Sequence, residues 1–544
     1  MTAAAGSRAR GDLAFEAAIL DLDGVLTRTA RLHAAAWKEV FDAFLAARAA
    51  AAPGEPPRPF DERADYLRHV DGKPRRDGVR DFLAARGIAL AEGTPDDPPG
   101  APTVGGLARR KNEIFRRLLD ERGVEVDAGA VALVRELRAR GLRTGLASSS
   151  RNARPVIERA SLAGLFDAVV AGDEAEALGL RGKPHPDILA ACAGRLAADP
   201  GRTAVLEDAA AGVAAARAGG FGVVVGVDRG GNRPALREAG ADLVVRDLGA
   251  LGLETLDAWF RGRADARPCA LARSSGLDER LARGRPAVFL DYDGTLTPIV
   301  ARPDLAVLDD GPRAVLAALA RACPTVIVSG RGREDVARLV ALEELYYAGS
   351  HGFDIAGPPG SAIRHEVDPG LAPAVAAAAR ELEARVGGIE GALVEDKRFS
   401  VAVHYRLVRE EDGPRVEAAV DAVLSGAPRL RKAHGKKVFE LRPAIDWDKG
   451  RALLFLIEAL GLDSPDLVPV YIGDDVTDED AFRAIAGRGA GILVAETPRP
   501  TAAAYSVADP DEVREVLCRI LEIARARARG GAGEVAGGSG GGRP

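Results

Sequence analysis

The stretch Asp21-Leu22-Asp23-Gly24-Val25-Leu26-Thr27 decides the fold, because its pattern returns as Asp291-Tyr292-Asp293-Gly294-Thr295-Leu296-Thr297. Each copy follows a short apolar run, residues 17–20 or 287–290, and such a run predicts a buried strand. The paired carboxylates therefore stand where a strand ends and a loop begins. In open α/β sheets, ligands bind at that edge. The sequence thus predicts two related domains, each with a site at the carboxyl end of a strand.

The composition permits two large domains. The chain has 544 residues, and a prior of roughly one domain per ~150 residues allows two large domains or three or four small ones. Hydrophobic residues make up 47% of the chain and charged residues 28%, values that are ordinary for soluble globular proteins. Each half can therefore build a sizeable core, and the repeated motif favours two domains.

The charge balance and the hydropathy pattern argue against several classes of partner. The formal net charge of -6 speaks against nucleic acid, because binding a polyanion needs a basic surface. Residues 1–13 lack an apolar stretch long enough for a signal sequence. The sequence also lacks an uninterrupted run of ~20 apolar residues, which argues against a membrane partner. We expect a cytoplasmic protein, and the sequence gives no indication of its oligomeric state. Neither disulfides nor a zinc site is expected, because the four cysteines lie far apart, at Cys192, Cys269, Cys323 and Cys518.

Short β-rich runs alternate with Ala/Leu/Arg-rich helical patterns in both halves. This alternation predicts parallel strands joined by crossover helices, and therefore two Rossmann-like α/β sheets. Further strands are expected at residues 142–147, 204–206 and 223–227 of the first half and at 325–328 and 467–472 of the second. Pro-rich stretches at 53–59 and 95–102 are expected to be loops around an inserted helical piece.

Two segments are expected to lie outside the domains. Residues 261–285 are polar and irregular and directly precede the second apolar run, which predicts a linker. The chain becomes Gly-rich from residue 528 to residue 544, a composition that buries too little apolar area to offset the entropy of ordering. We expect this tail to be disordered.

The paired aspartates suit phosphoryl transfer. A carboxylate such as Asp21 or Asp291 is a competent nucleophile toward phosphorus and forms an aspartyl-phosphate. A second carboxylate two residues later, Asp23 or Asp293, can protonate the leaving oxygen and then deprotonate the attacking water or hydroxyl. Such a centre also needs a hard cation and a fixed positive charge beside the transferred group.

Both halves supply candidates for these parts in the same order. The first half has a serine after a strand, a lysine and then an acidic pair: Ser148, Lys183, Glu207 and Asp208. The second half repeats the order with Ser329, Lys449, Asp474 and Asp475, followed by Asp478 and Glu479. Each element alone has an ordinary explanation, such as a helix cap, a turn or a solvated acidic face. Four elements in one order, found twice, favour a catalytic site in each half.

This ordered set resembles the haloacid dehalogenase superfamily of aspartate-dependent phosphotransferases. The resemblance implies the roles of nucleophile, acid/base, phosphate-binding serine and lysine, and acids that bind Mg²⁺. The implied cation sites combine Asp21, Asp23, Glu207 and Asp208 in the first half and Asp291, Asp293, Asp474 and Asp475 in the second. Members of the superfamily differ in where a substrate-selecting cap interrupts the core.

The intervals between the motifs predict two different caps. The long interval of the first half lies between Thr27 and Ser148, which places a helical cap at about 30–110 within a domain of 12–260. The long interval of the second half runs from Arg331 to Lys449. It implies an α/β cap at about 353–435, with a strand over 399–405, within a domain of 286–527. The two halves are therefore not expected to share a substrate.

The second half resembles the trehalose-6-phosphate phosphatases. The matching pieces are Ser329-Gly330-Arg331, Gly349-Ser350-His351-Gly352, Glu395-Asp396-Lys397, Val403-His404-Tyr405-Arg406, Glu440-Leu441-Arg442-Pro443, Asp446-Trp447-Asp448-Lys449-Gly450 and 473–479. Hydroxyl-rich sugars need charged acceptors and donors, so Glu395, Lys397 and Glu440 are candidates for holding the disaccharide. Arg331 and His351 complete the expected substrate-binding set.

The first half is similar to the β-phosphoglucomutases. The resemblance rests on His33 after the aspartate loop, Arg75 in Gly72-Lys73-Pro74-Arg75, Lys111 in Arg109-Arg110-Lys111-Asn112, and Asn152 after Ser148-Ser149-Ser150-Arg151. It implies that His33, Arg75, Lys111 and Asn152 bind a sugar phosphate. In a mutase the cap must also keep water from the phosphoenzyme.

We therefore expect a fused enzyme of trehalose metabolism. The second half would hydrolyse trehalose 6-phosphate to trehalose and phosphate through an aspartyl-phosphate, and the first would act as a β-phosphoglucomutase. Two alternatives remain for the first half: a general sugar-phosphate phosphatase, or a module without catalysis that senses a sugar phosphate. Arg28 stands where relatives often carry an acidic residue, which leaves the reaction partner of the first site open.

Overall fold

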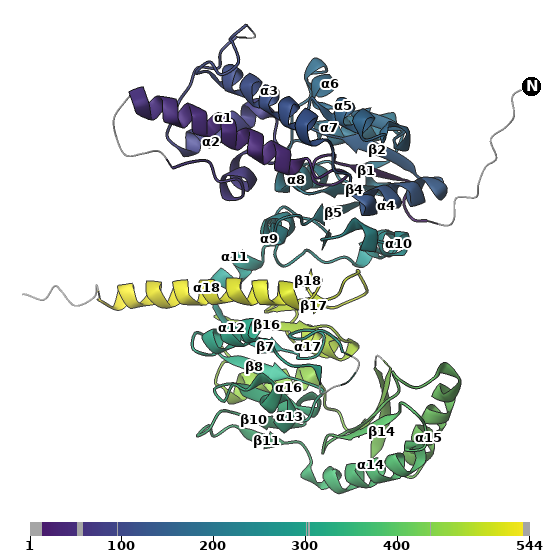
Figure 1. Ribbon diagram of the computed structural model, residues 1–544. Helices are drawn as coiled ribbons and strands as arrows, with labels where there is room; N and C mark the ends of the chain where they lie inside the picture. Colours follow the sequence, from purple (N-terminus) through teal and green to yellow (C-terminus); the bar gives the residue numbers. More distant parts are fainter. Residues whose placement is uncertain are drawn as a thin grey trace, which may run out of the picture. The chain divides into compact units, whose positions relative to one another are not determined.

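The computed structural model describes residues 13–51, 58–94, 96–300, 302, 305–435 and 437–536 (Figure 1). The chain divides into two compact units, Met1–Ala264 and Asp265–Pro544. Each unit carries one copy of the aspartate motif, and each is described by itself.

The first unit is built on a six-stranded parallel sheet. Its order is β3 (Ala168–Val170), β2 (Arg143–Ala147), β1 (Ala17–Leu20), β4 (Thr203–Glu207), β5 (Val223–Val227) and β6 (Leu243–Val245). The sequence Ala-Ala-Ile-Leu makes β1 a central strand because it is apolar on both faces: Ala18 and Leu20 enter one hydrophobic cluster, and Ala17 and Ile19 the other. The strands expected in this half are confirmed.

Helices cover the first sheet and form its cap. The core helices are α4 (Ala128–Ala139), α5 (Ala153–Arg159), α6 (Gly172–Ala177), α7 (Asp187–Arg195), α8 (Ala210–Ala218), α9 (Arg233–Glu238) and α10 (Leu253–Arg261). Between β1 and β2 lie α1 (Ala30–Ala51), one π-helical turn η1 (Tyr66–Val70), α2 (Arg75–Ala85) and α3 (Val104–Arg122), which confirms the helical cap (Figure 1). Cap residues such as Phe41, Phe82 and Phe115 belong to the same hydrophobic cluster as Leu20, so this cap shares the core of its domain.

The second unit contains an eight-stranded sheet. Its order is β11 (Arg364–Glu366), β10 (Asp354–Ala356), β9 (Tyr346–Gly349), β8 (Thr325–Val328), β7 (Arg285–Leu290), β16 (Leu467–Gly473), β17 (Ala490–Val494) and β18 (Tyr505–Val507). The pairs from β9 to β18 are parallel, and β10 and β11 are antiparallel additions at one edge. The helices of this core are α11 (Leu277–Ala282), α12 (Asp310–Ala320), α13 (Arg333–Val340), α16 (Lys449–Ala459), α17 (Glu479–Ala484) and α18 (Pro510–Ala536).

The cap of the second unit is an α/β layer, as expected. A four-stranded antiparallel sheet has the order β12 (Leu393–Asp396), β13 (Val401–His404), β15 (Val438–Pro443) and β14 (Leu430–Gly435). The helices α14 (Ala372–Val386) and α15 (Gly413–Ser425) pack on it (Figure 1). The cap has its own hydrophobic cluster, which includes Val375, Leu382, Val403 and Leu441. It is therefore a separate packing layer, unlike the first cap.

Several boundaries differ from the expectation. Residues within the expected linker 261–285 fold onto the second unit, because Leu277 and Leu281 of α11 are buried in its core and the Ala270 N–H donates to the Ser506 carbonyl at 2.9 Å. The expected second cap at 353–435 includes β10 and β11, which instead extend the core sheet, and its last strand continues to Pro443. Helix α18 runs to Ala536, so the expected disordered tail is helical at its start. The rest of the tail (537–544), residues 53–57 and residue 95 of the Pro-rich stretches, and residue 12 lie outside the described residues.

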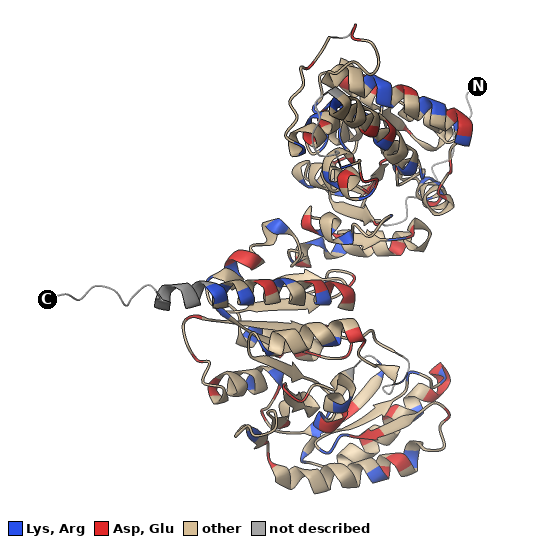
Figure 2. Cartoon of the chain, turned by 60° about the vertical axis from the view of Figure 1, so that its left-hand side comes forward, with Lys and Arg blue, Asp and Glu red and all other residues tan. Residues whose placement is uncertain are grey.

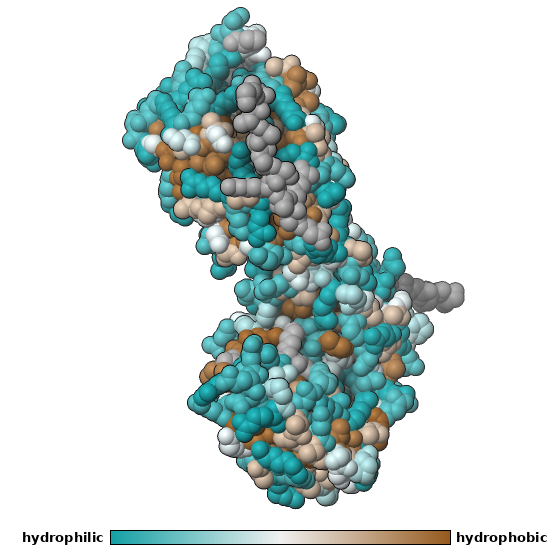
Figure 3. Space-filling model, turned by 90° about the vertical axis from the view of Figure 1, so that its right-hand side faces the viewer, coloured by the Kyte–Doolittle hydropathy of each residue, from teal (hydrophilic) through white to brown (hydrophobic). Residues whose placement is uncertain are grey.

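The surface mixes charges of both signs. Figure 2 shows acidic and basic residues interspersed on the helices of both units, in keeping with a net charge of only -6. On the face visible in Figure 3, apolar residues form patches among hydrophilic ones. Among the described residues, no helix combines the length and the apolar character that a membrane crossing requires.

Candidate active sites

The nucleophile candidate of the second unit lies at the carboxyl edge of its sheet. Asp291 directly follows β7, and its N–H donates to the Ile472 carbonyl of β16 at 2.9 Å. Because β7 and β16 are neighbours, Asp474 at the end of β16 lies beside this loop. Gly294 has a φ of +79°, and a Cβ on it would stand 2.3 Å from Asp474 Oδ2. Glycine is therefore required here, both for the turn and for the close approach of the two acidic loops.

Lys449 neutralises this acidic centre from the start of α16. Its Nζ lies 3.0 Å from Asp291 Oδ1 and 2.7 Å from Asp478 Oδ1, and its side chain is only 2% exposed. Burial and the neighbouring carboxylates of Asp478 and Asp474 raise the pKa of Asp291 well above its usual range, although Lys449 opposes the shift. Burial alone would lower the pKa of Lys449, but Asp291 and Asp478 raise it. The centre therefore holds a buried lysine in direct contact with a buried carboxyl group.

The acid/base candidate Asp293 is held by an arginine. Arg331 Nε and Nη2 donate to the two oxygens of Asp293 at 2.7 and 2.6 Å, and its Nη1 contacts Asp335 at 3.1 Å. Arg331 is positioned by the turn after β8, where its N–H donates to Ser329 Oγ at 3.2 Å. The paired carboxylates raise the pKa of Arg331 against the effect of burial. Arg331 was expected to bind substrate, and the structure also makes it the partner of Asp293.

The cap contributes a network of charges around Glu440. Its carboxylate accepts hydrogen bonds from Ser400 Oγ at 2.7 Å and Arg442 Nε at 2.7 Å, and lies 3.0 Å from His351 Nε2. Lys397 Nζ lies 3.6 Å from Glu440 Oε1. Burial opposes ionisation of Glu440, but Lys397, Arg442 and the contact with His351 lower its pKa well below the usual range. Burial also lowers the pKa of His351 to about 4, so this imidazole is neutral near pH 7.

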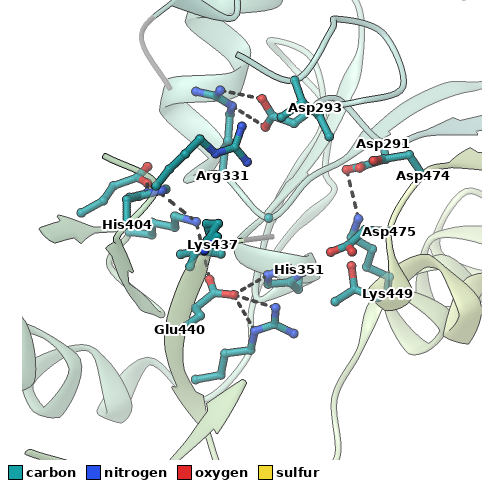
Figure 4. Close-up of a pocket in the computed structure, with 18 of the residues that line it drawn as sticks. Asp291, Asp293, Arg331, His351, His404, Lys437, Glu440, Lys449, Asp474 and Asp475 are labelled. Atoms are coloured by element: carbon teal, nitrogen blue, oxygen red, sulfur yellow. Dashed lines mark hydrogen bonds and ion pairs between the residues drawn. The ribbon is translucent and has the colours of Figure 1, made fainter. Parts of the chain in front are cut away.

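One pocket of about 210 Å³ joins these groups (Figure 4). It brings together nearly all the expected site residues of the second half, namely Asp291, Asp293, Arg331, His351, Glu395, Lys397, Glu440, Lys449, Asp474 and Asp475. Ser329 is not among the lining residues; it is buried directly after β8. Glu395 is further paired with His404, whose Nε2 lies 2.8 Å from Glu395 Oε2.

Some residues of this site were not singled out from the sequence. His404, Arg406, Lys437, Arg442 and Thr477 also line the pocket. Four of them, His404, Arg406, Arg442 and Thr477, lie inside quoted motifs. For His404 and Arg442, a place beside buried residues of a strand was the available signal. Lys437 sits in the turn between β14 and β15, where sequence pattern gives no indication of direction.

The first unit repeats the buried lysine at its own sheet edge. Asp21 follows β1, and its N–H donates to the Leu206 carbonyl of β4 at 3.0 Å. Lys183 Nζ donates to Asp21 Oδ1 at 2.6 Å and also contacts Glu207. Burial raises the pKa of Asp21, and it raises the pKa of Glu207 to about 8. Burial would lower the pKa of Lys183, but Asp21 and Glu207 raise it.

The acid/base candidate Asp23 has different partners in the first unit. Thr29 Oγ1 donates to Asp23 Oδ1, and His33 Nε2 lies 3.4 Å from the same oxygen. The other ring nitrogen of His33 lies 2.6 Å from Lys111 Nζ. Burial and the nearby Arg75 lower the pKa of Lys111 well below its usual range, which suits its close approach to an imidazole. Asp23 is thus the first of three side chains in contact, followed by His33 and Lys111.

The remaining residues of the first site surround a smaller cavity of about 60 Å³. It is lined by expected residues, Asp21, Asp23, His33, Arg75, Lys111, Ser148 and Asp208, and also by Trp37, Tyr66, Asp71 and Lys73, which were not predicted. The expected residue Asn152 is not among the lining residues; it is buried and donates to Asn112 Oδ1 at 2.9 Å. Burial and the neighbouring Arg151 and Arg116 lower the pKa of Arg75 to about 10. The cap side of this cavity therefore carries three basic side chains, Lys73, Arg75 and Lys111.

Each unit contains an acidic cluster that could hold a metal ion. Carboxylate oxygens of Asp21, Glu207 and Asp208, and likewise of Asp291, Asp474 and Asp478, come within 4.8 Å of one another. Oxygen ligands at such spacing suit a hard divalent cation. In the first cluster, buried Glu207 Oε2 has no hydrogen-bond partner, so the donor set fits a bound cation. Asp478 completes the second cluster, whereas Asp475, expected as a ligand, lines the pocket outside it.

Comparisons with known proteins agree with this geometry. A haloacid dehalogenase-like hydrolase family matches residues 15–220, and the trehalose-phosphatase family matches residues 289–511. The trehalose-phosphate phosphatase of Mycobacterium bovis is 43% identical over 343 residues, which make up 62% of this chain and 86% of that protein. An uncharacterized glycosyl hydrolase of Mycobacterium tuberculosis is 41% identical over 511 residues, 93% of this chain; the chain spans 38% of its length. A crystal structure of β-phosphoglucomutase from Clostridium difficile, 23% identical, covers 46% of this chain and 99% of its own, with a TM-score of 0.37.

The Rossmann-like sheets, their caps and the aspartate pairs at the strand ends define a haloacid dehalogenase-like hydrolase in each unit. The second unit carries the cap and charged pocket that set it apart from the first. The chain belongs to the trehalose-phosphatase family, because it is 43% identical to the phosphatase of Mycobacterium bovis and covers 86% of that protein.

Proposed function

We propose that the second unit hydrolyses trehalose 6-phosphate to trehalose and phosphate. One observation carries this proposal: the buried Asp291–Lys449 pair and the cap charges Glu395, Lys397 and Glu440 line a single pocket. The acidic core suits a phosphoryl group, and charged acceptors and donors on the cap suit the many hydroxyls of a disaccharide. The name of the relative in Mycobacterium bovis supports the same substrate.

The residues have distinct roles in this reaction. A carboxylate oxygen of Asp291 attacks phosphorus, and the bond from phosphorus to the sugar oxygen breaks. Asp293 gives its proton to the departing trehalose oxygen and then takes a proton from the water that attacks the aspartyl-phosphate. That second attack frees phosphate and restores Asp291. Ser329 and Lys449 bind the phosphoryl oxygens, and Glu395, Lys397, Glu440 and His351 hold the sugar.

We propose Mg²⁺ as the cofactor of both units. In the second unit Asp291, Asp474 and Asp478 would hold it, and in the first Asp21, Glu207 and Asp208. When bound, the ion supplies positive charge that offsets the negative charge of the transferred phosphoryl group.

The aspartyl-phosphate gives a direct test of the second site. We expect rapid acid quenching of the enzyme with trehalose 6-phosphate, followed by peptide mass spectrometry, to find phosphate on Asp291. Label that is absent from Asp291 and present on Asp21 would overturn the proposal, because it would assign the hydrolysis to the first unit.

For the first unit we propose phosphoryl transfer between positions of a hexose phosphate, as in a β-phosphoglucomutase. The basic side chains Lys73, Arg75 and Lys111 come from the cap and line the same cavity as Asp21, which suits a sugar that carries a second phosphate during transfer. The small cavity also supports the exclusion of water that a mutase needs.

The test of the first unit compares two acceptors for its phosphoenzyme. We expect the parent protein to convert β-glucose 1-phosphate to glucose 6-phosphate faster than it releases phosphate, and Asp21→Asn to do neither. Faster release of phosphate would favour a general sugar-phosphate phosphatase. Turnover unchanged by Asp21→Asn would leave only a role without catalysis.

A further inference from the structure

In both units, a side chain from the loop after the neighbouring strand donates to the main chain of the acidic loop. In the first unit, Asn232 Nδ2 donates to the Asp208 carbonyl at 2.7 Å. In the second unit, Arg499 Nη2 donates to the Asp474 carbonyl at 2.8 Å. Asp208 and Asp474 are the cation-ligand candidates that directly follow β4 and β16. The two units therefore hold the same carbonyl with different side chains.

The two donors occupy the same place in their sheets. Strand β5 is the parallel neighbour of β4, and β17 is the parallel neighbour of β16. Asn232 is the fifth residue after β5, and Arg499 is the fifth residue after β17. An amide and a guanidinium have in common that each donates a hydrogen bond to a carbonyl. The recurrence therefore indicates that a donor, and no particular residue type, is needed at this position.

In the first unit, a buried carboxylate fixes the loop that carries Asn232. Asp228 directly follows β5 and is only 6% exposed. Its Oδ1 accepts hydrogen bonds at 3.2, 2.6 and 2.9 Å from the N–H groups of Gly230, Gly231 and Asn232. Helix α9 begins at the next residue and contacts both β5 and β6. The main chain of Asn232 is therefore held in place, and its side chain reaches Asp208 from a fixed position.

In the second unit, the loop after β17 is fixed by other side chains. Glu479 of α17 is buried, and its Oε2 accepts a hydrogen bond from the Ala502 N–H at 2.7 Å. Arg267 Nη2 donates to the Thr501 carbonyl at 2.7 Å. The chain that follows Arg499 is therefore held by one acidic and one basic side chain. Each unit thus fixes the loop of its donor by its own means.

The hydrogen bond from each donor acts on the spacing between the acidic loop and the aspartate loop. The candidate ligands of each cation come from both loops, namely Asp21, Glu207 and Asp208 in the first unit and Asp291, Asp474 and Asp478 in the second. Figure 4 shows Asp474 beside Asp291. The loops are already in close contact, because a Cβ on Gly24 would overlap the Asp208 carboxylate and a Cβ on Gly294 would overlap that of Asp474. A shift of the acidic loop therefore changes the arrangement of oxygens that a cation meets.

We infer that Asn232 and Arg499 are positioning residues of the two cation sites. Each holds the main chain of its acidic loop at the spacing from the aspartate loop that Mg²⁺ binding requires. The inference rests on the proposed Mg²⁺ sites and extends them by one residue in each unit. Mg²⁺ demands near-ideal octahedral geometry, whereas Ca²⁺ accepts variable coordination. Loss of a positioning residue should therefore weaken Mg²⁺ binding more than Ca²⁺ binding.

The test of the second unit measures cation binding to the full chain by titration calorimetry in an Asp208→Asn background, which silences the first site. We expect Arg499→Met to weaken Mg²⁺ binding about tenfold, as loss of an outer partner of a metal ligand typically does, and to weaken Ca²⁺ binding less. Arg499→Lys keeps a donor and should stay close to the background. Arg488→Met is the matched control, because Arg488 is an exposed arginine that pairs with Asp463. It should leave both affinities unchanged.

The test of the first unit removes the donor without a change of charge. Asn232→Leu is compared with its Asp474→Asn background, in which the second site is silenced. The Asn232 side chain makes no capping hydrogen bond to α9, so the substitution does not uncap that helix. We expect the same selective loss, about tenfold for Mg²⁺ and less for Ca²⁺. Asn232→Ala, which adds no bulk, should behave in the same way.

The outcomes separate this inference from the proposed cation sites. Mg²⁺ affinity within about twofold of the background in Arg499→Met or Asn232→Leu would overturn the positioning role in that unit. Equal losses for Mg²⁺ and Ca²⁺ would overturn it in favour of a general distortion of the site. Tighter binding of both ions in Arg499→Met would overturn it in favour of a charge effect, because the guanidinium repels a bound cation. Mg²⁺ binding that is the same in the parent and in the Asp208→Asn, Asp474→Asn double variant would refute the cation sites themselves, and the inference with them.

Discussion

The two hydrogen bonds from Arg331 to Asp293 give a prediction that distinguishes a role of Arg331 in acid catalysis from a role in phosphate binding. Arg331 donates two hydrogen bonds to Asp293, at 2.6 and 2.7 Å, from a side chain that is only 6% exposed. These bonds orient Asp293, and the guanidinium stabilises the carboxylate that remains after Asp293 has given its proton to the leaving sugar. We therefore expect Arg331→Met to slow the step in which that proton is transferred.

The magnitude follows from the geometry. Hydrogen bonds to charged groups contribute about 1.5–3 kcal/mol each, but the Asp293 side chain is 41% exposed, so solvent screens the pair. A total of about 2 kcal/mol corresponds to a rate loss of about 30-fold.

The assay compares two substrates in single turnovers. Trehalose is a poor leaving group and needs the proton of Asp293, whereas p-nitrophenolate departs as an anion and does not. We expect Arg331→Met to form the phosphoenzyme about 30-fold more slowly from trehalose 6-phosphate and to change little with p-nitrophenyl phosphate. Arg338→Met is the matched control, because Arg338 is exposed and contacts Asp335 from the same helix. Equal losses on both substrates would refute the reasoning and assign Arg331 to the phosphoryl group.

Three further predictions address the cap, the catalytic turn and the buried acids. Glu440→Gln should raise the KM for trehalose 6-phosphate about tenfold, because loss of a hydrogen bond to a charged acceptor weakens binding by about that factor. The KM for p-nitrophenyl phosphate should change little. Glu417→Gln, at an exposed carboxylate of the cap, is the control, and a fall in kcat without a rise in KM would contradict the prediction. Gly294→Ala should weaken Mg²⁺ binding to the second unit, measured by calorimetry in an Asp208→Asn background, because its Cβ would overlap Asp474; Gly311→Ala, which has open space, should not. Burial raises the pKa of Glu207 from 4.5 to about 8, so its protonation stabilises the metal-free fold below pH 4.5, and that stability is lost as pH rises through 8. The urea concentration at the unfolding midpoint, measured in EDTA, should therefore fall between pH 4.5 and pH 8. An equal fall in Glu207→Gln would show that Glu207 is not the group responsible.

The fold could be predicted from the sequence where a strand is apolar on both faces. Residues 17–20, 223–227 and 325–328 were found because each is a short apolar run with no exposed position. The edge strands β11 and β12, and β10 beside β11, were not found, because they are short and, in β11 and β12, partly exposed, so their pattern resembles a loop.

The boundaries failed for a related reason. Leu277 and Leu281 lie four residues apart in an otherwise polar segment, so the apolar side of α11 is too short to stand out from a linker. Such a helix becomes evident only through the core that it packs against.

The candidate site residues were predictable because phosphoryl chemistry restricts residue types near a strand end. Asp291, Lys449 and Asp474 come together as the ordered motifs indicated. Asp71, which lines the first cavity, was missed because its place there depends on which part of the core the cap turn contacts, and the spacing of residues in the cap carries no information about that contact. The same holds for the pairing of Arg331 with Asp293.

The central claim is that the two aspartate loops run one chemistry on different sugars. The most direct measurement compares phosphate release from trehalose 6-phosphate, and glucose 6-phosphate formation from β-glucose 1-phosphate, in the parent, Asp21→Asn and Asp291→Asn proteins. Asp291→Asn should abolish the first activity and spare the second, and Asp21→Asn should do the reverse. Hydrolysis of trehalose 6-phosphate that survives in Asp291→Asn would contradict the account.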